Sequence, residues 1–174
     1  MEYRRFYIQG GTYFFTVVTY NRKPIFSSDE VISLLRCSFH YTMQKHPFTI
    51  IANVILPDHM HFIWTLPEND DNYSLRWQMI KNHFTRHYIN KEIKSSSSSK
   101  QLKGEKDIWQ RRFWEHYIYN QEDFENHFNY IHYNPVKHEY VESASEWEYS
   151  SIHKYIKEGY EEPTETGMDL EWDK

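Results

Sequence analysis

Two apolar runs of the chain are separated by only two residues, and this spacing constrains the fold more than any other feature. Residues 48–56 are almost continuously apolar, and residues 59–66 include Phe62, Ile63 and Trp64. The link Pro57-Asp58 leaves room only for a tight turn, so the two runs predict an antiparallel hairpin. The apolar character of residues 48–56 further predicts a central strand that is covered on both faces.

Strand and helix signals alternate on both sides of this hairpin. Residues 12–20 and 109–118 are rich in aromatic residues and predict two further strands. Apolar residues recur with helical spacing from about residue 29 to 45, 73 to 93 and 121 to 133. The third helix is expected to end before Pro135, because proline disfavours the α conformation in the residue before it. A short helix is expected within residues 143–157.

The resulting order of elements, β-α-β-β-α-β-α, is that of the split βαβ, or ferredoxin-like, arrangement. We therefore predict an α+β fold with a four-stranded antiparallel sheet and helices on one face. The other face is expected to be open, and such faces are common platforms for nucleic acids. The fold supports many functions and does not by itself identify one.

The acidic charge of the chain is concentrated at its C-terminal end. The 174 residues include 20 Lys and Arg and 25 Asp and Glu, for a net charge of −5. Residues 158–174 hold seven of the acidic residues and one basic residue, which leaves 19 basic and 18 acidic residues in the rest. We expect one domain over residues 1–157 and an acidic tail over residues 158–174. The tail is either solvated or competes with a nucleic acid for a basic site.

No feature of the sequence indicates secretion or a membrane. Cys37 is the only cysteine, so no intramolecular disulfide can form. No N-terminal apolar stretch resembles a signal peptide, and no apolar run approaches the length of about 18 residues that a membrane span needs. A cytoplasmic protein without a membrane partner is therefore expected.

His59 and His61 stand one residue apart in the second strand of the hairpin. Positions i and i+2 of a strand point to the same face, so both imidazoles would lie beside Ile63. Met60, Phe62 and Trp64 would point to the opposite face. The chain has 11 His, which makes one such pair by chance unremarkable, and the context of the pair has to decide its role.

The third helix carries Tyr130 and Asn134 at positions i and i+4, on one face, with His127 one turn earlier. If this helix lies against His59 and His61, two imidazoles and an amide oxygen could hold a divalent ion and leave positions open for phosphate oxygens. The Tyr130 phenol could then act as a nucleophile. The alternatives are a packing role for Tyr130 and a helix-capping role for Asn134.

Four segments, in their order along the chain, resemble the REP-associated tyrosine transposases, which belong to the single-tyrosine HUH transposases of bacterial insertion sequences. The segments are YRRFYIQGGTYFFT (3–16), LPDHMH (56–61), IWQRRFWEH (108–116) and YIHYNPVKH (130–138). The resemblance implies that His59 and His61 are metal ligands, that Asn134 is the third ligand, and that Tyr130 is the nucleophile. It further implies cleavage of single-stranded DNA beside palindromic hairpins through a 5′-phosphotyrosine, with Mg²⁺ or Mn²⁺ as cofactor.

Two features depart from the pattern expected of this family. The loop over residues 94–106 is expanded. Glu139 stands where the family often has a glycine, directly after the run Pro-Val-Lys-His. Basic and aromatic residues are the candidates for DNA contacts, because phosphates need cations and unpaired bases need stacking surfaces. These candidates are Arg4, Arg5, Trp109, Arg111, Arg112, Trp114 and Lys137.

We therefore predict a cytoplasmic, nucleoid-associated DNA nickase and strand transferase that acts on single-stranded DNA with hairpins, as a monomer or a homodimer. The alternative is a ferredoxin-like module that binds nucleic-acid hairpins without cutting them. A Zn²⁺ hydrolase is less favoured, because it would need a third nitrogen, sulfur or carboxylate ligand near the histidine pair.

Overall fold

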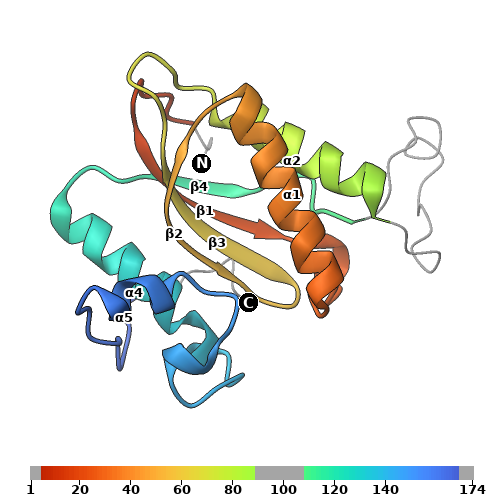
Figure 1. Cartoon of the computed structure of the whole chain (residues 1–174). Helices are drawn as coiled ribbons and strands as arrows, with labels where there is room; N and C mark the ends of the chain where they lie inside the picture. Colours follow the sequence, from red (N-terminus) through yellow and green to blue (C-terminus); the bar gives the residue numbers. More distant parts are fainter. Residues whose placement is uncertain (1–4, 89–107, 169–174) are drawn as a thin grey trace.

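A four-stranded antiparallel sheet forms the centre of the molecule (Figure 1). The computed structural model describes residues 5–88 and 108–168. The strands lie in the order β2-β3-β1-β4 and comprise β1 (Thr12–Val18), β2 (Thr49–Ile55), β3 (His59–Thr65) and β4 (Trp114–Tyr117). This is the strand order of the split βαβ arrangement, and the predicted α+β class is confirmed. The expanded loop over residues 94–106 lies outside the described residues.

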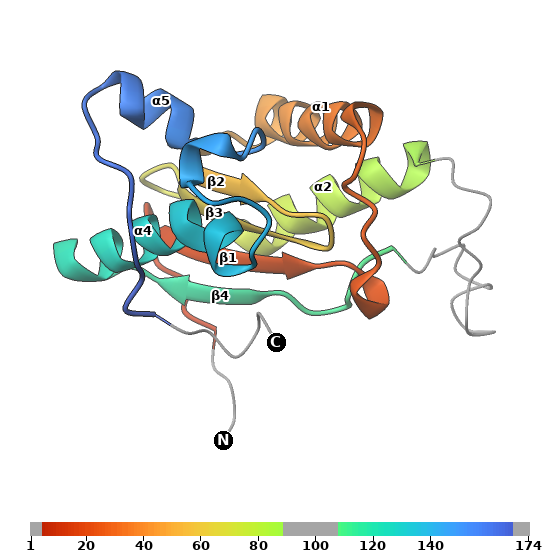
Figure 2. The same ribbon diagram turned by 90° about the horizontal axis from the view of Figure 1, so that it is seen from below.

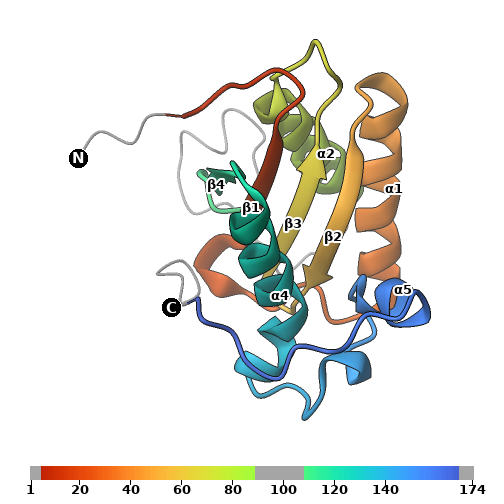
Figure 3. The same cartoon turned by 90° about the vertical axis from the view of Figure 1, so that its left-hand side faces the viewer.

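Helices cover both faces of the sheet rather than one (Figure 3). The helices α1 (Asp29–Lys45) and α2 (Tyr73–His87) pack on one face, as predicted. The helix α4 (Gln121–Lys137) packs on the face that was expected to be open. The reason lies in the central strands, whose large apolar side chains point both ways: Phe15 contacts Trp77 of α2, whereas Phe14 contacts Tyr130 of α4.

The remaining elements are short and lie around this framework. They are the 3₁₀ turns η1 (Tyr20–Arg22) and η2 (Ala144–Glu146) and the helix α5 (Ile152–Lys157), which falls within the range predicted for a short helix.

The first residues of the acidic tail contact the body of the protein. Tyr160 donates a hydrogen bond of 2.6 Å to Asn129, and Glu162 accepts one of 2.9 Å from the backbone of Ser145. The domain boundary at residue 157 stays a prediction.

The predicted hairpin is present, and its side chains alternate as expected. The backbone N–H of Leu56 donates to the carbonyl of His59 at 2.8 Å and closes the turn between β2 and β3. Met60, Phe62 and Trp64 enter the core beneath α1 and α2, whereas Ile63 enters the cluster beneath α4. His59 and His61 therefore share the α4 face with Ile63.

The prediction that residues 48–56 form a central strand is wrong, because β2 lies at an edge of the sheet. Its apolar character has another cause: residues 147–151 cover its outer edge (Figure 2). Ser151 N–H donates to the carbonyl of Asn53, and Ile55 N–H donates to the carbonyl of Tyr149, both at 2.9 Å. An edge that is covered in this way is protected from pairing with another chain.

Helix α4 continues through Pro135 and ends at Lys137, so the predicted end before the proline is wrong. Proline lacks an N–H and thus removes one helical bond, but its fixed φ is compatible with a helix. The turn after α4 is closed by two backbone hydrogen bonds. Tyr140 N–H donates to the carbonyl of Pro135 at 3.0 Å, and Glu139 N–H donates to that of Val136 at 2.9 Å. This bond pair is a Schellman motif, in which Glu139 takes the left-handed position with φ of 58°.

Replacement of Glu139 by glycine is therefore expected to stabilise the protein. A left-handed φ costs a residue with a Cβ about 1 kcal/mol, and glycine avoids this cost. We expect Glu139→Gly to raise the melting temperature by about 2–4 °C in thermal unfolding. Glu122→Gly, in the first turn of the same helix, should lower it. A melting temperature that falls in Glu139→Gly would contradict the argument.

Candidate active site

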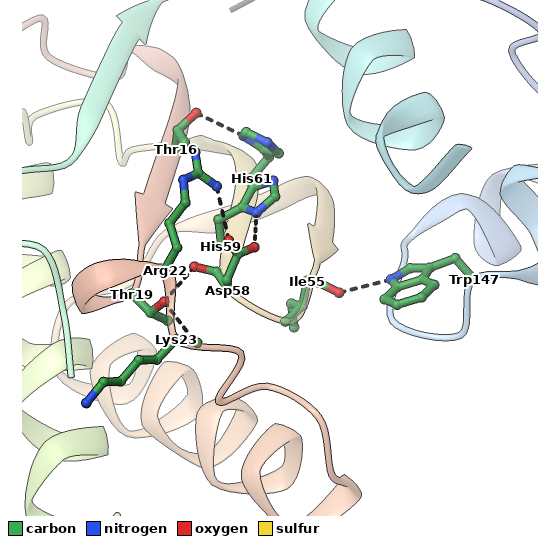
Figure 4. Close-up of polar contacts among 9 residues, drawn as sticks. All are labelled: Thr16, Thr19, Arg22, Lys23, Ile55, Asp58, His59, His61 and Trp147. Atoms are coloured by element: carbon green, nitrogen blue, oxygen red, sulfur yellow. Dashed lines mark hydrogen bonds and ion pairs between the residues drawn. The ribbon is translucent and has the colours of Figure 1, made fainter. Parts of the chain in front are cut away.

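His59 and His61 lie at the start of β3, with their ring centroids 5.1 Å apart and their side chains almost completely buried. The Nδ1 atom of each ring is held by a neighbouring oxygen (Figure 4). For His59 this is Asp58 Oδ1 at 2.6 Å, and for His61 it is Thr16 Oγ1 at 2.9 Å. Oxygen partners at Nδ1 orient an imidazole and direct Nε2 toward a metal. In each ring Nε2 is therefore the nitrogen that could bind a metal.

Asp58 links the first of these rings to a cation. Its Oδ2 atom accepts a hydrogen bond of 3.1 Å from Arg22 Nη1. Burial alone would raise the pKa of Asp58, but His59 and Arg22 hold it below its ordinary value. Asp58 is therefore ionised at neutral pH and favours a proton on Nδ1 of His59, which leaves the lone pair on Nε2.

Helix α4 brings Tyr130 and Asn134 to the same face of the sheet. Tyr130 is fully buried, and its ring lies 5.4 Å from the ring of His61, nearly perpendicular to it at 75°. Phe14 of β1 fills the space between sheet and helix and contacts both rings. Tyr130 is thus the α4 tyrosine that faces the histidine pair, whereas Tyr133 is only half-buried.

Asn134 shows that the site is suited to a ligand that the protein itself does not supply. Its side chain is fully buried, and within the described residues neither Oδ1 nor Nδ2 makes a hydrogen bond. The same holds for Nε2 of His59. Buried polar atoms without partners are rare and costly. Two imidazole nitrogens and an amide oxygen fit a divalent ion, and the helix end is closed by backbone bonds rather than by the Asn134 side chain.

Lys137 and His138, which follow Asn134 at the end of α4, also reach the site. The sequence predicted a catalytic role for neither of them. Lys137 places Nζ 3.5 Å from the Tyr130 hydroxyl and 4.8 Å from the centre of its ring. The His138 ring lies 5.0 Å from that of His59. Burial, together with His59, His61 and Lys137, lowers the pKa of His138 to about 4, so it is neutral at pH 7. The sequence signal that could have identified Lys137 and His138 is their spacing, because positions seven and eight residues after Tyr130 lie on the same helical face as Tyr130.

His127 does not join the histidine pair, because the Phe14 ring stands next to it, with centroids 4.7 Å apart. It belongs instead to a separate cluster with Asp123 and His116 of β4. Asp123 accepts hydrogen bonds from His116 Nε2 at 2.8 Å and lies 3.1 Å from His127 Nδ1. These groups could share a cation, but their hydrogen bonds with one another already account for the arrangement.

The candidates for DNA contacts lie in different environments. Arg5 pairs with Glu115 at 3.3 Å, and Trp109 packs on Phe84 and donates to Thr85 at 3.2 Å. Trp114 lies on the α4 face, since it contacts Phe14. Of the other candidates, Arg111 and Arg112 are exposed, and Arg4 lies outside the described residues. All these DNA contacts remain predictions.

Comparison with known proteins identifies the class to which this fold and site belong. The family model described as "Transposase IS200 like" matches residues 8–134. This range contains the histidine pair, Tyr130 and Asn134. Among the helices over residues 5–88 and 108–168, none is long and apolar enough to cross a membrane.

Individual relatives narrow the class further. A Haemophilus influenzae protein is 46% identical over 156 residues, 90% of this chain and 88% of the relative. The REP-associated tyrosine transposase of Escherichia coli (strain K12) is 44% identical over 91% of this chain and 86% of its own length. A solved REP-associated tyrosine transposase bound to a REP hairpin matches with a TM-score of 0.80 and 40% identity, over 98% of this chain and 95% of that one. The chain therefore belongs to the IS200-like transposases and, within them, to the REP-associated tyrosine transposases.

The contact between Asp58 and His59 generates a prediction about metal binding. Loss of an outer partner of a ligating histidine typically weakens metal affinity by about 10- to 100-fold. We expect Asp58→Asn to weaken the binding of Mn²⁺ within this range, as measured by titration calorimetry. Asp71→Asn, in the loop before α2, serves as the matched control and should bind Mn²⁺ like the wild type. Unchanged affinity in a folded Asp58→Asn variant would refute the role of Asp58.

Proposed function

We propose that this transposase cleaves single-stranded DNA beside REP-type hairpins and transfers the strand through a 5′-phosphotyrosine on Tyr130. His59, His61 and Asn134 would hold the Mg²⁺ or Mn²⁺ ion. The observation that carries the proposal is Asn134, whose fully buried amide makes no hydrogen bond within the described residues and stands one helical turn from Tyr130. Support for the DNA partner comes from the hairpin bound to the structural relative.

The proposed reaction is a phosphoryl transfer with Tyr130 as the entering group. Its phenolic oxygen attacks the phosphorus of a DNA phosphodiester, so that the Tyr130 O–P bond forms and the bond from phosphorus to the 3′-oxygen breaks. The phenol proton is lost to solvent, and the leaving 3′-oxygen takes up a proton. An incoming 3′-hydroxyl reverses these steps and rejoins the strand. A bound divalent ion would polarise the phosphoryl oxygens and stabilise charge in the transition state.

Residues of the chain prepare Tyr130 for this role. A phenol is mostly protonated at pH 7, because its ordinary pKa is about 10. The Lys137 ammonium lies 3.5 Å from the hydroxyl, where a positive charge favours phenolate. Packing against Phe14 and His61 fixes the direction of the ring. A module that only binds hairpins would need neither feature, so both support cleavage over binding alone.

A covalent adduct is the direct test of the nucleophile. Incubation of the protein with single-stranded hairpin DNA and Mg²⁺ or Mn²⁺ should yield a protein–DNA adduct on a denaturing gel. Tyr130→Phe should abolish the adduct because no oxygen remains to attack, and His59→Ala should abolish it through loss of a ligand. Tyr133→Phe, one helical turn away, should retain it. An undiminished adduct in Tyr130→Phe would exclude Tyr130 as the nucleophile.

The role of Lys137 predicts a change in pH dependence. In Lys137→Met we expect adduct formation at pH 7 to slow about tenfold, which corresponds to about 1.4 kcal/mol of lost phenolate stabilisation. The pH–rate profile should move to higher pH, because more hydroxide is needed to reach the same phenolate fraction. Lys154→Met removes an ammonium that lies over another tyrosine ring, Tyr155, and should change neither property. A reduced rate without a displaced profile would indicate that Lys137 contacts DNA instead.

A further inference from the structure

An aromatic pocket of ≈ 360 Å³ lies along β4, the strand at the end of the sheet opposite β2. Its volume falls in the range of small-molecule sites. Rings from the N-terminal segment, from Tyr13 of β1 and from β4 and its continuation line it, together with the Glu115 carboxylate; the rings include those of Phe6, Trp114, His116 and Tyr119. Phe6 is 64% exposed and Tyr119 67% exposed. Exposed large apolar side chains gathered around a pocket are typical of a binding surface.

One wall of the pocket lies on the same face of the sheet as the candidate active site. In the antiparallel register Trp114 pairs with Thr16, and Thr16 pairs with His61. Paired residues point to the same face, and neighbouring strands lie about 4.8 Å apart, so the backbone of Trp114 lies about 10 Å from that of His61, with both side chains on the α4 side of the sheet. Thr16, between them, holds the His61 ring by its 2.9 Å hydrogen bond.

The wall of the pocket is held in place by the Asp123 cluster. Asp123 accepts a hydrogen bond from His116 Nε2 at 2.8 Å and another from the backbone of Tyr119 at 3.2 Å. The rings of Trp114 and His116 are nearly parallel, at 14°, with centroids 5.9 Å apart. Because Asp123 is itself fixed in the first turn of α4, these rings are positioned before any ligand arrives.

We propose that this pocket holds one unpaired base of the single-stranded DNA next to the cleaved phosphate, stacked on Trp114 and Tyr119. This inference rests on the proposed function. Aromatic side chains are the usual stacking surfaces for unpaired bases, and every base offers a suitable face. A distance of about 10 Å corresponds to about three stacked nucleotides, at about 3.4 Å each along one strand. The base in the pocket therefore lies within three nucleotides of the phosphate that Tyr130 attacks.

The test measures stacking without the reaction. The Tyr130→Phe protein is mixed, in EDTA, with hairpin DNA that carries single-stranded flanks and 2-aminopurine at one flank position at a time. We expect strong quenching of 2-aminopurine at one position, and loss of this quenching in Trp114→Ala. Trp114→Phe should retain part of it. Tyr41→Ala, which removes a ring from α1 on the opposite face of the sheet, is the control and should behave like its parent.

A thermodynamic cycle then assigns the base to the pocket. Trp114→Ala should weaken binding of intact DNA about tenfold, within the range of one base–aromatic stack. It should have little effect on DNA that has an abasic residue at the quenched position. Equal losses on intact and abasic DNA, quenching at no position, or no binding to any of these DNAs would overturn the proposal.

The outcomes also separate this proposal from the proposed reaction. Site-specific quenching in EDTA, together with a wild-type protein that forms no adduct in Mg²⁺ or Mn²⁺, would retain the pocket and refute the phosphotyrosine mechanism. Adduct formation by wild type without site-specific quenching would refute the pocket alone.

Discussion

The two central strands carry large apolar side chains on both faces, and the rest of the structure depends on the burial of both sets. On one side Phe15, Phe62 and Trp64 are covered by α1 and α2. On the other side Phe14 and Ile63 need a second layer, which α4 supplies. Burial of an aromatic side chain stabilises the folded state by about 1.5–3 kcal/mol. The packing that buries Phe14 is thus also the packing that brings Tyr130 and Asn134 over the histidine pair.

The short turn between β2 and β3 has a similar double role. Its two residues fix the register of the hairpin, and a one-residue slip would move His59 and His61 to the opposite face. The second turn residue, Asp58, is also the group that orients His59 and pairs with Arg22. On the neighbouring strand, Thr16 holds His61 from a position in direct register. The outer partners of the proposed ligands therefore come from the elements that define the sheet.

The sequence was sufficient for the fold class and for the faces of β3, because strand periodicity and a two-residue link are local properties. It was insufficient where tertiary contacts decide. The apolar run of β2 indicates that the strand is covered, but it does not show which element covers it. A neighbouring strand was expected, whereas the segment around Ser151 covers the outer edge. Pro135 predicts the end of a helix, but α4 continues to Lys137 and the turn after it is closed by backbone hydrogen bonds. The candidate site shows the same limit: spacing together with the resemblance to the family singles out His59, His61, Tyr130 and Asn134, whereas the contact of Lys137 with Tyr130 depends on how far α4 extends.

The covered edge of β2 determines how the sheet can grow. Main-chain groups of Asn53 and Ile55 are already bonded to residues 149–151, so a strand from another molecule cannot pair there without displacing them. Within residues 5–88 and 108–168, no strand pairs with the outer edge of β4. Among the described strands, sheet extension would thus form along the outer edge of β4, the strand that carries Trp114 and His116. Such an assembly would therefore form along the strand whose side chains line the aromatic pocket.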